Sequence, residues 1–145
     1  IRASAASTGG DYIRLVVQQL TTLGQVPFQW SPPDGYPDVR DYWLNTSALL
    51  TRWNFDLALA EGRLAPLLAI DGSALAGTAR SPAQLVDQLA DRLLHRALDP
   101  ADRDALSAYA GGGTAPDGAF RKGEREAAIA ALVGVLLASD YFQYH

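Results

Sequence analysis

The sequence predicts an all-α fold, an irregular bundle of about five or six helices with a long ordered loop rich in proline and aromatic residues. Apolar residues recur at helical spacing through most of the chain. The run Leu67–Ile70 has the character of a short strand, but no partner strand follows it, so we interpret residues 63–80 as a loop that packs a few leucines. Prolines at 27, 32, 33 and 37 exclude both helix and central strand between residues 26 and 37.

The first predicted helix lies just before this proline-rich loop. Its apolar face is formed by Ile13, Val16, Val17, Leu20 and Leu23. Asp11 stands at the positive end of the helix, and Gly24 stands where a left-handed residue commonly ends one. The loop itself is expected to be ordered, because Phe28, Trp30 and Tyr36 would each bury roughly 150–250 Å² and offset the entropy lost on fixing it.

Two helices are predicted after the loop. A short one runs from Asp38 through Trp43, and a longer one begins at a cap among residues 45–47 and ends near Gly62. Leu50, Trp53 and Leu57 lie on one face of the longer helix. Arg52 and Asp56 form an i, i+4 pair on another face.

The second half of the chain contains three further helix signals. Ser81 before Pro82 opens one helix, and Asp99 before Pro100 opens another that ends at the glycines from 111. Residues 111–120 are expected to form a mobile glycine-rich loop. The last helix begins between residues 122 and 126, and it is apolar almost all round from 127 to 138. We therefore expect it either at the centre of the bundle or partly covered by chain that is absent here.

Composition indicates one folded domain over residues 1–145, with 1–10 as a flexible lead-in. The chain is 48% hydrophobic and 19% charged, and its formal charge of −4 argues against a nucleic-acid partner. Cysteine is absent, which excludes disulfides and thiolate metal sites. Methionine is absent even at position 1, so we expect a processed form or a fragment of a longer chain. The longest apolar run is shorter than the roughly 20 residues that span a bilayer, and no membrane span is expected.

Few residues are candidates for chemistry. The two histidines, His95 and His145, have no metal-ligand spacing, and no metal site or cofactor is expected. An acidic group at Asp34, Asp38 and Asp41 is a candidate catalytic group, although Asp34 and Asp38 also suit turn and helix-start positions. The candidate binding residues are the aromatic side chains Trp30, Tyr36, Tyr42 and Trp43. These rings suit a sugar or peptide surface, or else they form the core that anchors the loop.

Several long motifs resemble one bacterial family. They are Leu23–Phe28, Pro33–Asp38, Trp43, Leu49–Phe55, Asp91–Arg96 and Leu136–Gln143. Together they span nearly the whole chain, and they are similar to the C-terminal part of the family catalogued as domain of unknown function 1800. The resemblance implies a mostly helical, exported or envelope-associated protein, located in the periplasm or outside the cell. It carries over no catalytic residue, and Asp140 departs from the residue that the family usually has there.

These observations lead to three alternative functions. The first is a structural or interaction domain of an exported bacterial protein, which packs against the missing N-terminal portion or another envelope protein. The second is part of a hydrolase-like enzyme that uses the acidic loop group. The third is a glycan-binding module that uses the loop aromatics.

Overall fold

The fold is all-α, as the sequence predicts. A computed structural model describes residues 9–24, 26, 28–37, 39, 46–64, 68–121 and 123–144. Within these ranges the chain forms seven helical segments and no strand. The segments are α1 (Gly9–Thr22), α3 (Thr46–Ala60), α4 (Gly72–Ala76), α5 (Pro82–Leu94), α6 (Pro100–Gly111), α7 (Glu124–Ala138) and α8 (Asp140–Gln143).

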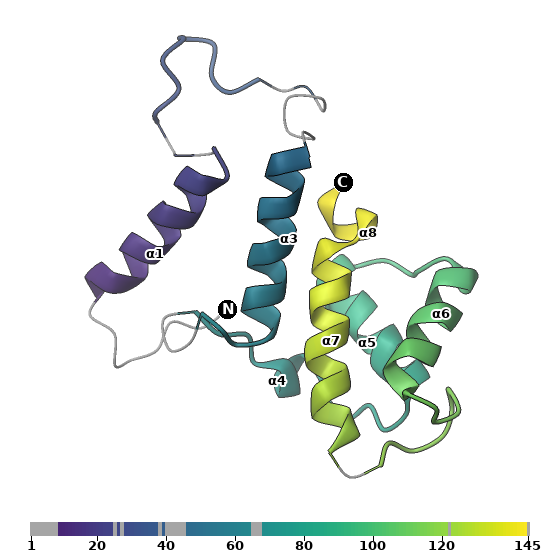
Figure 1. The fold of residues 1–145 in the computed structure, drawn as a ribbon. Helices are drawn as coiled ribbons and strands as arrows, with labels where there is room; N and C mark the ends of the chain where they lie inside the picture. The colour runs from purple at the N-terminus through teal and green to yellow at the C-terminus, as the bar shows by residue number, and fades with distance from the viewer. Residues whose placement is uncertain are drawn as a thin grey trace.

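Helix α7 occupies the centre of the bundle. It contacts α3, α4, α5, α6 and α8, and Figure 1 shows α3 along one of its sides with α5 and α6 on the other. Leu132 and Leu136 of α7 are completely buried in the main hydrophobic core. An apolar helix of this kind is stable in water only when neighbours cover it. The helices of this chain supply much of that cover themselves.

Helices α5 and α6 pair on the far side of α7. Leu85, Val86 and Leu89 of α5 are fully buried. Ser81 caps α5 by accepting a hydrogen bond from the Gln84 backbone nitrogen at 3.4 Å, with Pro82 in the first turn, as predicted.

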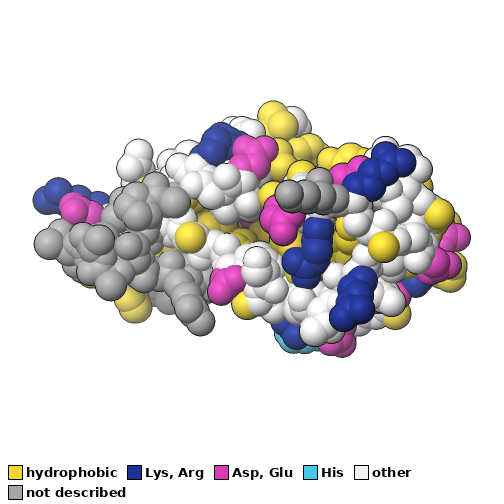
Figure 2. Space-filling model, turned by 90° about the horizontal axis from the view of Figure 1, so that it is seen from below, with side chains coloured by type: hydrophobic (Ala, Val, Ile, Leu, Met, Phe, Trp, Pro, Cys, Tyr) yellow, Lys and Arg dark blue, Asp and Glu magenta, His cyan; other side chains and the backbone are white. Residues whose placement is uncertain are grey.

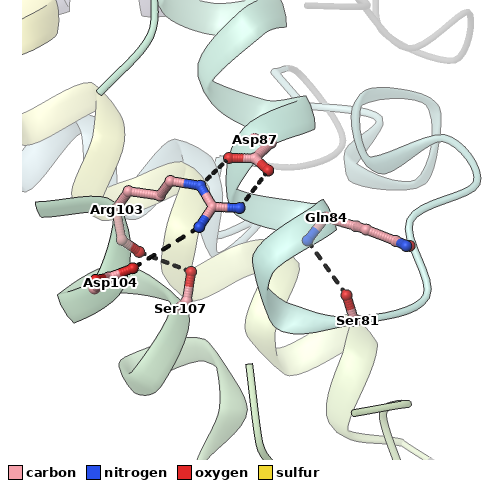
Figure 3. A network of polar contacts seen from close by, with 6 residues as sticks. All are labelled: Ser81, Gln84, Asp87, Arg103, Asp104 and Ser107. Atoms are coloured by element: carbon pink, nitrogen blue, oxygen red, sulfur yellow. Dashed lines mark hydrogen bonds and ion pairs between the residues drawn. The ribbon is translucent and has the colours of Figure 1, made fainter. Parts of the chain in front are cut away.

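An exposed ion pair joins α6 to α5 (Figure 3). The Arg103 guanidinium donates to both oxygens of Asp87, at 2.6 and 2.7 Å. Ser107, one turn further along α6, donates to the Arg103 carbonyl at 2.7 Å. The bidentate geometry fixes the register of the two helices more than it stabilises them, because solvent screens an exposed pair.

The glycine-rich segment 111–120 is tied to the start of α5. Ala83 donates its backbone N–H to the Pro116 carbonyl at 2.9 Å, and Phe120 donates to the Arg80 carbonyl at 3.1 Å. Gly112 adopts a left-handed conformation that ends α6. The mobility of this segment, like the flexibility of residues 1–10, stays a prediction.

Two short helices were not expected from the sequence. The region 63–80, predicted as a loop, contains α4, which Asp71 caps by accepting a hydrogen bond from the Ala74 nitrogen at 2.9 Å. A cap and one turn are too short to give a periodic apolar pattern. After α7, Ser139 adopts an extended conformation and starts α8. The helix predicted over 38–43 lies outside the described residues, apart from Val39.

Helix α1 lies apart from the other helices in Figure 1. None of residues 10–22 is buried, although the predicted apolar stripe is present. Among the described helices, none combines the length and apolar character needed to cross a bilayer.

The close approach of α7 to α3 at Gly134 generates a stability prediction. A Cβ on Gly134 would lie 3.0 Å from Leu57 Cδ2 and 3.4 Å from Ala60 Cβ. We expect Gly134→Leu to lower the free energy of unfolding by about 1–3 kcal/mol or more, because the helices must separate to admit the side chain. Urea denaturation measures the change.

The matched control is Ala127→Leu, which adds the same side chain at an exposed position of the same helix. This control is expected to stay within about 0.5 kcal/mol of the parent. Equal effects of the two substitutions would contradict a close α3–α7 contact at Gly134.

Candidate functional site

A largely apolar pocket lies where α3, α4, α5, α7 and α8 meet. Its volume is about 540 Å³, within the range typical of small-molecule sites. The lining residues are Phe55, Asp56, Leu59, Ile70, Asp71, Ala74, Leu75, Arg92, Leu93, Leu137 and Phe142. Three of these residues are charged, so the pocket combines an apolar wall with a few polar groups.

Asp56 is the buried charged residue of this pocket, with 8% of its surface exposed. Gln143 of α8 donates from Nε2 to Asp56 Oδ2 at 3.1 Å and to the Leu137 carbonyl at 2.8 Å. The Gln143 side-chain oxygen accepts a hydrogen bond from Arg52 Nη1 at 3.2 Å. Gln143 therefore bridges α3 to the end of α7 and holds the Asp56 carboxyl in place.

The second oxygen of Asp56 accepts no hydrogen bond from any residue that the structure describes. Among the described residues, the hydrogen bond from Gln143 to Oδ2 is the one that the carboxyl accepts. No fully buried side-chain polar atom in the described ranges lacks a partner. Asp56 Oδ1 is therefore still accessible, and the pocket that Asp56 lines is the space next to it.

Burial raises the pKa of Asp56 from 3.8 to about 7. Removing the carboxylate from water is the largest cause, and it outweighs the positive charge of Arg52 and the hydrogen bond from Gln143, which both lower the pKa. The Asp56 carboxyl thus changes its charge close to neutral pH. A perturbed carboxyl in a pocket is a common property of binding and catalytic sites.

Two charged residues lie at the rim of the pocket, and both are held by α4. Asp71 Oδ1 accepts the cap hydrogen bond from the Ala74 nitrogen. Arg92 Nη1 donates to the Ala74 carbonyl. The rim therefore carries one positive and one negative group, each fixed by a backbone contact.

The site residues expected from the sequence lie elsewhere, in the proline loop. The Trp30 and Tyr36 rings pack against each other with centroids 4.9 Å apart and planes tilted by 40°. Tyr36 donates its hydroxyl to the Val26 carbonyl at 2.8 Å, and Trp30 Nε1 donates to Asp34 Oδ1 at 3.3 Å. These contacts all lie within the loop. The expectation that Phe28 is buried with the two rings is wrong, because Phe28 is fully exposed.

Four other expected site residues, Asp38, Asp41, Tyr42 and Trp43, lie outside the described residues. The acidic group at 34, 38 and 41 therefore remains a prediction. In the described part of the chain, no three His, Asp or Glu side chains gather as a metal site would require.

Two helix faces with partly exposed apolar side chains are further candidate surfaces. On α1, Ile13 is 60% exposed and Val17 is 44% exposed. On α3, Leu50 is 49% exposed, and Trp53 of the same face is also exposed. We call these residues the α1 face and the α3 face.

Sequence reasoning did not find the Asp56 pocket. Arg52 and Asp56 were expected as an ordinary i, i+4 pair, whereas Asp56 is buried and Gln143, 87 positions away, joins it to Arg52. The one local signal is that Asp56 lies between Phe55 and Leu57 in an apolar stretch. That signal does not say which face the rest of the chain covers.

The raised pKa of Asp56 predicts a specific pH dependence of stability. Between about pH 4 and pH 7 the folded protein keeps a proton that the unfolded chain has already released. Rising pH therefore lowers the free energy of unfolding over this range, by at most about 1.4 kcal/mol per pH unit. Asp56→Asn cannot titrate and retains an oxygen for Gln143. We expect the variant to gain stability relative to the parent from pH 4 to about 7 and to keep a constant difference above that.

Urea denaturation of both proteins at several pH values measures this difference. Asp117→Asn is the control, since it removes an exposed carboxylate that is not part of the pocket. If the stability curves of parent and Asp56→Asn run parallel from pH 4 to 8, Asp56 does not titrate as described.

Comparisons with known proteins identify one family. A family model described as protein of unknown function (DUF1800) matches residues 2–144. Neither a curated protein nor a solved structure matches the chain. The match covers nearly the whole sequence and agrees with the resemblance seen in its motifs, so the chain belongs to the DUF1800 family.

Proposed function

We propose that the chain is a structural or interaction domain of an exported bacterial protein. In this proposal the α1 and α3 faces pack against a protein segment that presents an apolar face of its own. The segment belongs either to another part of the same polypeptide or to another envelope protein. The observation that carries the proposal is the α1 face, an apolar stripe at helical spacing whose residues are not buried.

Helix α1 has the amphipathic pattern of a helix that packs its apolar face against another part of a protein. Isolated helices of about 14 residues are marginal in water, and most helices in proteins gain stability by burying an apolar face. Ile13 and Val17 remain exposed among the described residues, so this source of stability is missing. A partner that covered both side chains would gain about 1–1.5 kcal/mol from each, because roughly half of each side chain is still exposed.

The α3 face extends the argument to a second helix. Leu50 and Trp53 are exposed although they lie on α3, which packs against α7. Contiguous exposed apolar residues mark interaction sites more often than scattered ones do. Figure 2 shows another side of the molecule, where arginine and acidic side chains alternate among apolar patches. A polyanion site would instead gather its basic side chains on one face.

The other two expected functions have less support. A glycan platform would use Trp30 and Tyr36, whose rings partly cover each other. A hydrolytic acidic group would need Asp38 and Asp41, which the structure does not describe. We therefore do not propose either as a second function.

The proposal predicts that α1 is covered in the natural protein. The test is amide hydrogen exchange of residues 9–22 in two samples. The first sample is this chain alone. The second is the full polypeptide that the gene encodes, in an envelope extract of the source bacterium. We expect slower exchange in the second sample, because a partner that buries the α1 face stabilises the helix. Equal exchange rates in the two samples would rule out this role for α1.

A pair of variants connects that protection to the α1 face. Ile13→Lys with Val17→Lys places two charges in the stripe, whereas Gln18→Lys with Thr22→Lys places the same charges on exposed positions of the opposite side. The first pair is expected to abolish the added protection, and the second pair to retain it. Loss in both, or in neither, would show that the stripe does not hold the partner.

Export is the other part of the proposal, and it is supported by the family resemblance alone. Fractionation of the source bacterium, followed by detection with an antibody to this chain, tests it. We expect the protein in the periplasmic, outer-envelope or culture-medium fraction. Recovery with the cytoplasmic proteins would overturn export and leave the interaction role open to its own test.

A further inference from the structure

We propose that the pocket around Asp56 binds an apolar molecule that carries a protonated amine. The amine would lie at Asp56 Oδ1, and the apolar part would lie between α3, α5 and α8 against Phe55, Leu93 and Phe142. This ligand site is separate from the α1 and α3 faces, so it goes beyond the interaction role proposed above.

The first argument is the shape of the pocket and the nature of its wall. A volume of about 540 Å³ admits a molecule of drug-like size. Seven of the lining side chains are large and apolar: Phe55, Leu59, Ile70, Leu75, Leu93, Leu137 and Phe142. Such a wall favours a ligand with a substantial hydrocarbon part, because binding removes apolar surface from water on both sides.

The second argument is the unpaired oxygen of a buried carboxyl. Asp56 makes no ion pair with a described residue, and Oδ1 accepts no hydrogen bond from one. A purely apolar ligand would take water away from Oδ1 and leave it without a donor, which is unfavourable. An anionic ligand would place two negative groups together in an apolar site. A ligand with a donor avoids both problems.

The third argument concerns the charged groups that face Asp56, and it favours a cation over a neutral donor. Arg52 on α3 donates to Gln143, and Arg92 on α5 donates to the Ala74 carbonyl, while Asp71 before α4 caps that helix. Arg52 acts on Asp56 through its charge, but neither arginine donates a hydrogen bond to Oδ1. A protonated amine would supply a charge-assisted hydrogen bond to Oδ1, which is stronger than the bond from a hydroxyl.

The test compares three probes that share one hydrocarbon chain and differ in the head group. n-Octylamine, n-octanol and octanoate are titrated separately into the 145-residue chain at pH 8 by isothermal titration calorimetry. We expect n-octylamine to bind about tenfold or more tightly than n-octanol, and octanoate to bind most weakly. No binding of n-octylamine, or equal binding of the amine and the alcohol, would overturn the proposal.

Substitutions of Asp56 and of the pocket wall test whether the probes bind in this pocket. Asp56→Asn is expected to remove the preference for the amine and to leave the affinity for n-octanol unchanged. Leu93→Trp fills part of the pocket and is expected to weaken all three probes. Asp117→Asn removes one carboxylate elsewhere and should retain the amine preference, which separates the pocket from general attraction to an acidic protein. An amine preference that survives in Asp56→Asn would assign the binding to another place.

The dependence on pH gives an independent readout. Lowering the pH from 8 to 5.5 protonates Asp56, whose pKa is about 7. We expect n-octylamine binding to weaken by about tenfold, because the carboxyl then carries no charge to pair with the amine. n-Octanol binding should not change. The paired substitution Ile13→Lys and Val17→Lys should not affect either probe, so failure of the ligand site and failure of the interaction role are distinguishable.

Discussion

The structure depends on the burial of one helix that is apolar almost all round. Leu132 and Leu136 of α7 reach zero exposure only because other helices surround α7. Gly134 contributes by its lack of a side chain, since Leu57 and Ala60 of α3 occupy the space next to the position that a Cβ would take. Because the packing is close, the position of α7 determines where each helix in contact with it can lie.

The pocket follows from where that packing ends. Helix α3 lies close to α7 at Gly134, while α8 turns back after Ser139 and brings Gln143 to Asp56. Between these points the helices leave an apolar space of about 540 Å³. The Asp56 carboxyl faces this space with one oxygen held and the other open. Burial of a carboxyl is unfavourable unless it is neutral or paired, which agrees with its raised pKa.

The fold could be predicted further than the site. Periodic apolar stripes and the helix starts at Ser81–Pro82 and Asp99–Pro100 located α5, α6 and α7, because these signals are local in the sequence. The contact between Gln143 and Asp56 joins residues 87 positions apart, and no local pattern encodes it. The exposure of Leu50 could not be predicted from the sequence either. An apolar stripe shows which residues share a helix face, but it does not show whether a neighbouring element covers that face.

The α1 and α3 faces and the Asp56 pocket differ in the chemistry that they require of a binding partner. The α1 and α3 faces expose aliphatic side chains and a tryptophan without a buried charge, so shape and apolar area are enough to select a partner there. The Asp56 pocket adds a carboxyl with an open oxygen, so a partner must also bring a donor. A protein segment satisfies the first requirement easily, whereas the second favours a small molecule whose head and tail match one buried group and one apolar wall. We therefore expect the two surfaces to act independently, so that substitutions in one leave the other intact.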